Sequence, residues 1–124
     1  MATIVNLVQL LEKGAARLSA AAIEARRAGD YARSEGLRGE ADAFLLLAVE
    51  LQEREDAASL LDALYGMEQA AIWTARLDEQ KAAELDTQGD RAASRYHAKS
   101  ARYSHGLIRG YQQARLLLCS ACES

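Results

Sequence analysis

The residues best suited to metal chemistry lie in the last third of the chain. Cys119 and Cys122 have the CxxC spacing, and His97 and His105 precede them. A zinc ion needs four such ligands within about 2.3 Å of one point. If this segment is one helix, its rise of about 1.5 Å per residue places the two histidines about 12 Å apart along the axis, and His105 about 21 Å from Cys119. One helix therefore cannot assemble the site, and only ligands from another subunit or from a folded-back tail could complete it. We expect no metal and no cofactor.

Other patterns that support catalysis are also missing from the sequence. Di-metal helical bundles use Glu-x-x-His pairs, but Ser94 and Arg102 stand three residues before the two histidines. Ser104 and His105 are adjacent, so on a helix their side chains diverge rather than face each other. The chain contains no nucleophile elbow, phosphate-binding loop or dinucleotide fingerprint. These observations predict a protein that is not an enzyme.

A group of acidic residues between positions 40 and 56 could be read as a catalytic pair or as a mimic of nucleic acid. The spacing of these residues is irregular. The pattern therefore favours a solvated face that keeps an alanine-rich protein soluble.

A basic stripe in the segment from Gly89 to Leu118 is the strongest candidate for a functional surface. On a helical wheel of about 100° per residue, five cations fall within roughly 80° of one another. They are Arg91, Arg95, Lys99, Arg102 and Arg109. Residues 1–90 carry 9 basic and 17 acidic side chains, whereas residues 91–124 carry 6 and 1. The last helix is therefore a basic element on a protein of net charge −3.

A second stripe on the same helix carries aromatic and apolar residues. Its members recur at spacings of three and four, the pattern of a helix face that packs against other helices. They are Tyr96, Ser100, Tyr103, Leu107, Tyr111, Ala114 and Leu118. We expect this stripe to be buried.

The basic stripe has three interpretations. Its cations could form ordinary ion pairs with the acidic helices, each worth about 0 to 1 kcal/mol. They could bind nucleic acid with tyrosines stacking on bases, although the tyrosines lie on the other stripe and the acidic remainder would repel a polyanion. They could dock on an acidic surface of a larger protein, because arginine and tyrosine are enriched at interface hot spots. We rank the protein partner above nucleic acid.

Four long helices must position these residues. The chain has no proline and is rich in alanine, which favours helices over strands. Thr3 is expected to cap the first helix. The dipeptides Gly29-Asp30 and Gly89-Asp90 each predict a tight turn, since glycine accepts the left-handed conformation and aspartate caps the next helix. The sequence around the two turns is similar, GDYARS in the first and GDRAAS in the second, which either an internal duplication or a reused turn would produce.

The predicted fold class is all-α, an antiparallel four-helix bundle built from two similar hairpins. Residues 1–124 form one domain, with hairpins at about 3–56 and about 57–118 and a short tail at 119–124. The junction between the second and third helices is the least defined boundary, because it contains neither glycine nor proline and depends on a cap at Asp56 or Ser59. If neither residue acts as a cap, residues 31–86 form one helix, and a dimer that exchanges halves becomes the natural solution.

Two features of the middle helices bear on packing. Gly36 and Gly39 weaken the second helix, so they indicate either close approach of another group or a kink. The third helix carries an apolar arc too broad for one neighbour, which suits two helices or a second subunit. Because all helices have wide alanine faces, we expect a homodimer.

The sequence places the protein in the cytoplasm without a membrane partner. The N-terminus lacks an early basic region, and the longest uninterrupted apolar run, residues 43–49, is too short to span a bilayer. Two cysteines fit a reducing compartment better than a disulfide framework. We expect a non-enzymatic interaction module, an adaptor or a small stoichiometric inhibitor such as phages and mobile elements encode. It would dock on an acidic protein surface through its last helix, and nucleic-acid binding through the same stripe is the alternative.

Overall fold

A computed structural model of the chain describes residues 3–54 and 56–123. Within these ranges it contains four helices and no strand: α1 (Ile4–Arg27), α2 (Tyr31–Gln52), α3 (Ala57–Thr87) and α4 (Arg91–Glu123). The all-α prediction is confirmed. Residues 119–123 of the segment predicted to be a tail are instead the last turn of α4, and Ser124 lies outside the described residues. No helix in the described part of the chain is long and apolar enough to cross a membrane.

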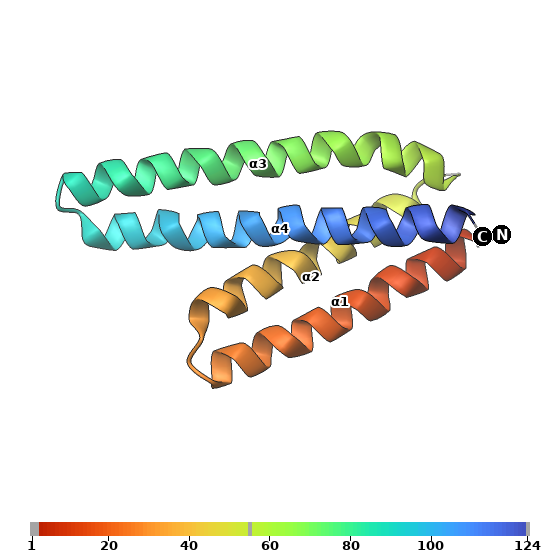
Figure 1. The fold of residues 1–124 in the computed structure, drawn as a ribbon, viewed down its shortest axis with the longest axis horizontal. Coiled ribbons are helices and arrows are strands. Elements are labelled where there is room, and N and C mark those ends of the chain that lie inside the picture. The colour runs from red at the N-terminus through yellow and green to blue at the C-terminus, as the bar shows by residue number, and fades with distance from the viewer. Residues whose placement is uncertain (1–2, 55, 124) are drawn as a thin grey trace.

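The helices form two antiparallel hairpins that meet along α2 and α4 (Figure 1). α1 packs on α2, α2 crosses α4, and α4 packs on α3, so the order across the molecule is α1, α2, α4, α3. The start of α1 and the end of α4 lie at one end of the molecule. The two hairpin turns lie at the other end, where the hairpins diverge. The predicted bundle of two hairpins is therefore confirmed, with α2 and α4 as its central pair.

Side-chain caps determine where the helices begin. Thr3 Oγ1 accepts a hydrogen bond from the backbone N–H of Asn6 at 3.1 Å, as predicted. Asp56 has extended backbone and its carboxylate accepts from the N–H of Ser59 at 2.6 Å. Since Asp56 caps α3, the second and third helices are separate, and the alternative of one helix over residues 31–86 is wrong.

The two hairpin turns have the same geometry. In each turn a glycine with positive φ (82° and 85°) ends one helix, and the aspartate that follows accepts a hydrogen bond from the N–H three residues later. A serine hydroxyl then donates to a carbonyl of the preceding helix at 2.8 Å, Ser34 to Ala22 and Ser94 to Ala82. The similarity in sequence therefore extends to the side-chain contacts that hold each turn.

The core is richest in leucine where the four helices meet near the chain ends. Leucines from every helix are less than 2% exposed there. They are Leu11 of α1, Leu47 and Leu51 of α2, Leu60 and Leu64 of α3, and Leu118 of α4. Toward the hairpin turns the buried residues are mostly alanine, glycine and serine. Part of the apolar arc of α3 lies on its outer side, where Tyr65, Trp73 and Leu77 are exposed.

Glycines bring α2 and α4 into backbone contact where they cross. A Cβ atom at Gly39 would collide with the carbonyl oxygen of Tyr103, and one at Gly106 would collide with the carbonyl of Gly36. Glycine permits this approach because it has no side chain. Of the two roles considered for Gly36 and Gly39, close approach of another backbone is the one that the structure shows.

Candidate interaction surface

The five cations of the basic stripe fall into two groups. Lys99 Nζ lies 3.7 Å from Glu35 Oε1, and Arg109 Nε lies 3.1 Å from Glu40 Oε1. The other three are exposed, and no acidic side chain in the described residues lies within ion-pair distance of them. They are Arg91, Arg95 and Arg102, and we call them the arginine row.

Arg109 forms an ion pair within the fold, although half of its side chain is exposed. Its partner Glu40 is 6% exposed and also accepts a hydrogen bond from Gln113 Nε2 at 3.2 Å. The Arg109 guanidinium lies directly over Gly36. A carboxylate withdrawn from water needs such donors, because an unpaired buried charge is costly. The ion-pair interpretation of the stripe therefore describes Lys99 and Arg109, but not the arginine row.

We expect Arg109→Ala to lower the free energy of unfolding by about 1–3 kcal/mol, because Gln113 would be the one side-chain donor left to Glu40 among the described residues. Arg102→Ala, in the arginine row of the same helix, should change it by less than about 0.5 kcal/mol. Urea unfolding followed by circular dichroism measures both. Equal effects of the two substitutions would contradict the structural role of Arg109.

The aromatic and apolar stripe of α4 is buried only in its C-terminal half. Tyr111, Ala114 and Leu118 are at most 5% exposed, whereas Tyr96 is 69% exposed. The prediction that the whole stripe is buried is therefore wrong for its N-terminal half. The physical reason is that the hairpins diverge toward their turns, which leaves one side of α4 uncovered (Figure 1).

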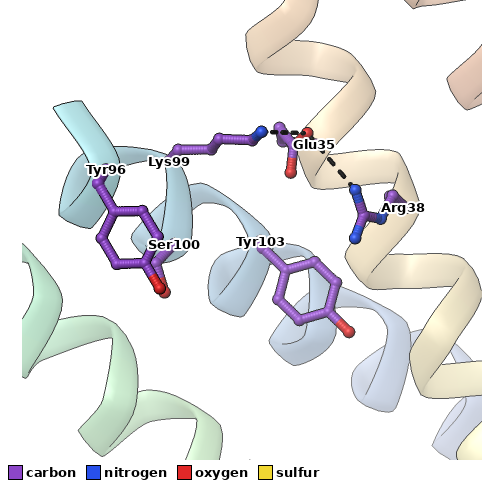
Figure 2. Close-up of a pocket in the computed structure, with 6 residues that line it drawn as sticks. All are labelled: Glu35, Arg38, Tyr96, Lys99, Ser100 and Tyr103. Atoms are coloured by element: carbon purple, nitrogen blue, oxygen red, sulfur yellow. Dashed lines mark ion pairs between the residues drawn. The ribbon is translucent and has the colours of Figure 1, made fainter.

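A hollow of about 230 Å³ lies between the start of α2 and the uncovered side of α4 (Figure 2). Glu35 lies between two cations there, 3.8 Å from Arg38 Nη1 and 3.7 Å from Lys99 Nζ. The Arg38 guanidinium lies 5.8 Å from the centre of the Tyr103 ring, within range of a cation–π interaction. Since one carboxylate serves two cations, this hollow has a net positive charge.

Tyr103 joins the two hairpins through a hydrogen bond. Its hydroxyl donates to Asp42 Oδ2 at 2.5 Å. Burial, and then the hydrogen bond to Asp42, raise the pKa of Tyr103 above its ordinary value, and burial raises the pKa of Tyr111. Asp42 and Glu40 are both engaged across the hairpins, so the expectation that this acidic group is a solvated face is wrong for these two residues.

Stability should fall as the pH rises above about 10, the pKa of an unperturbed tyrosine. The unfolded chain loses its tyrosine protons first, because the folded protein holds the proton of Tyr103 to higher pH. Each such group contributes up to about 1.4 kcal/mol of lost stability per pH unit between its unfolded and folded pKa values. Urea unfolding at a series of alkaline pH values measures the slope, and Tyr103→Phe should make it shallower. An unchanged slope in that variant would contradict the assignment.

Both histidines face carboxylates of α3. His97 Nδ1 lies 2.9 Å from Asp78 Oδ1, and Ser100 Oγ donates to Asp78 Oδ2 at 2.7 Å. His105 Nε2 contacts the carboxylate of Glu79. The sequence analysis did not single out Asp78, although its distance from the predicted turn at Gly89 could have identified it as a partner of α4. In an antiparallel hairpin, partners lie about equally far from the turn, and Asp78 and Ser100 are equally distant from Gly89 along the chain.

The CxxC pair is only partly within the described structure. Cys119 is half-buried and its thiol is free, whereas the side chain of Cys122 lies outside the described residues. Among the side chains that are described, no group of three or more His, Cys, Asp and Glu residues is arranged to hold a metal ion.

The fold and this surface define a class, an all-α protein of two antiparallel hairpins with an arginine row on its last helix. Comparison with models of protein families, with curated proteins and with solved structures finds no match.

Proposed function

We propose that this protein is a non-enzymatic interaction module, an adaptor or a small stoichiometric inhibitor, that docks on an acidic surface of a larger protein through the arginine row. One observation carries the proposal. The three arginines of the row have no acidic partner in the described part of the chain, whereas Lys99, Arg109 and Arg115 on the same helix are all paired.

The arginine row has the geometry of a docking surface. Its members are four and seven residues apart, which spaces them by about 6 and 10 Å along α4. The helix backbone fixes this spacing before binding, and each guanidinium can bind a carboxylate through two hydrogen bonds. Complementary charge then steers association and selects the partner.

An exposed leucine favours a protein partner over nucleic acid. Leu116 is 71% exposed, and on the helical wheel it falls about 40° from the centre of the arginine row. An apolar side chain beside arginines can fill a pocket on a protein. The exposed Tyr96, which could stack on a base, lies about 100° around the helix from Arg95.

We also propose that the protein acts as a homodimer in the cytoplasm. The free thiol of Cys119 suits a reducing compartment. Several large apolar side chains on α2 and α3 are exposed in the single chain, which supports self-association.

A charge-reversal pull-down tests the proposed docking. The bait is the tagged full-length protein in lysate of its native cells, with and without nuclease. The test variant is Arg91→Glu/Arg95→Glu/Arg102→Glu. The control variant, Lys13→Glu/Arg17→Glu/Arg76→Glu, changes the net charge equally at exposed cations of α1 and α3 that have no ion pair in the described residues. Circular dichroism checks that both variants fold.

We expect a stoichiometric protein partner that survives nuclease, is retained by the control and is lost from the test variant. Fluorescence anisotropy should show that the control variant binds a polyglutamate peptide and that the test variant does not. This binding should weaken as salt is added. Loss of the captured material after nuclease would replace the protein partner with nucleic acid. Equal capture by both variants would remove the arginine row as a binding site.

A further inference from the structure

An apolar groove opens between α2 and α3, over α4. Two hollows, of about 440 and 220 Å³, share Tyr103 of α4. Met67 and Ala70 of α3 line the first, and Leu45 and Leu46 of α2 line the second. The two hollows adjoin at Tyr103. We call the surface that they form the groove face.

The groove face exposes aliphatic side chains that lie next to one another. Leu45, Leu46 and Val49 of α2 are 44%, 46% and 53% exposed. A further hollow continues from Leu45 and Val49 onto Ala16 of α1. Neighbouring exposed aliphatic side chains favour an interface, because burial against a partner removes apolar surface from water.

The area of the single chain matches the needs of a dimer. The chain exposes 7611 Å², whereas a compact monomer of 13.5 kDa exposes roughly 6,500 Å². The excess of about 1,100 Å² exceeds the ~800 Å² that each partner buries in a standard interface. The excess is therefore large enough for one side of an interface with a second copy.

Charges of opposite sign lie in the hollows that adjoin the two ends of the groove face. Glu12 of α1 shares a hollow with Val49 and has no ion pair in the described residues. At the other end, Arg38 and Lys99 both pair with the carboxylate of Glu35 and with no other carboxylate in the described residues (Figure 2). A second copy turned end to end by a two-fold axis places the acidic end of one copy on the basic end of the other.

We propose that the groove face is the self-association surface, occupied by a second copy of this chain around a two-fold axis near Leu46. This inference deepens the homodimer part of the proposed function and does not depend on the acidic partner. The arginine row lies roughly 150° around α4 from the residues that line the groove, so it stays outside the interface. The dimer therefore presents two arginine rows, which doubles the contacts available to a partner with repeated acidic sites.

Sedimentation equilibrium of the full-length chain tests the proposal. Leu46→Glu and Val49→Glu each place a charge in the groove face at a position exposed in the single chain, so the fold should persist. Leu116→Glu is the control, because it makes the same change at an exposed position of α4 beside the arginine row. Glu12→Lys tests the charge pairing at the ends. Circular dichroism reports whether each variant is folded.

We expect a wild-type mass of twice 13.5 kDa and a dissociation constant raised about 100-fold or more by either groove variant. Leu116→Glu should leave it unchanged, and Glu12→Lys should raise it about tenfold. A monomeric wild type, or a dimer equally weakened by Leu116→Glu, would overturn the proposal. The charge-reversed arginine row should remain dimeric, so failure of self-association and failure of partner docking are measured separately.

Discussion

Gly39→Ala should destabilise the protein by about 3 kcal/mol or more, although it adds only one methyl group. The new Cβ would collide with the carbonyl oxygen of Tyr103 and lie 2.9 Å from the backbone nitrogen of Leu107. These are backbone atoms of α4, so no side chain can turn aside to make room. The helices must separate instead.

Separation of α2 from α4 would weaken other contacts as well. The same two helices are joined by Arg109 to Glu40 and by Tyr103 to Asp42. Both hydrogen bonds depend on the short distance that the glycines allow. The cost of Gly39→Ala therefore exceeds that of a steric contact with one flexible side chain.

Gly66→Ala is the matched control for this prediction. Gly66 lies within α3, and nothing lies within 4 Å of the position that its Cβ would occupy. Alanine is a better helix former than glycine, so this substitution should stabilise the protein by about 1 kcal/mol. Urea unfolding at one fixed protein concentration compares the two, since the proposed self-association would make the stability depend on concentration. If both substitutions raise the free energy of unfolding, α2 and α4 do not make the backbone contact described at Gly39.

The helix boundaries could be predicted from the sequence because the residues that determine them are close together in the chain. Thr3, Asp30, Asp56 and Asp90 each cap a helix through the N–H three residues later, and a short window of sequence contains both partners. The two Gly-Asp turns fix which helices are antiparallel neighbours. The order of the hairpins in space is not local, because it depends on a crossing between α2 and α4.

Because of that crossing, the sequence indicates the glycines of α2 in this contact but not the glycines of α4 that they meet. The positions of Gly36 and Gly39 indicate close approach of another group, but the complementary pair, Gly106 and Gly110, lies far along the chain on α4. A Cβ at Gly110 would lie 2.7 Å from the carbonyl oxygen of Glu40. No spacing rule within one helix joins residues so distant, so sequence alone could not select the partner.

In the candidate site, too, the sequence predicts features within one helix but not contacts between helices. A helical wheel places five cations on one stripe, but it cannot say which of them an acidic neighbour neutralises. Glu40 and Glu35 reach Arg109 and Lys99 only because α2 crosses α4 at this level. The arginine row is therefore the part of the predicted basic stripe that has no ion pair in the described residues.

Leu118→Ala should lower the free energy of unfolding by about 2–5 kcal/mol, as expected for a leucine in a close-packed core. Leu118 is 0% exposed and belongs to the same buried cluster as Leu11 of α1, Leu51 of α2 and Leu64 of α3. The cluster lies where all four helices meet. A cavity there would loosen both hairpins together.

The control is Leu116→Ala, on the same turn of α4. Leu116 is 71% exposed, so its truncation should change the stability by less than about 0.5 kcal/mol. The two variants remove the same atoms from the same helix, and their difference therefore isolates packing from helix propensity. Urea unfolding at a fixed protein concentration measures that difference. Equal, small effects would mean that the end of α4 is frayed rather than held in the core, and the four helices would then not close at this end.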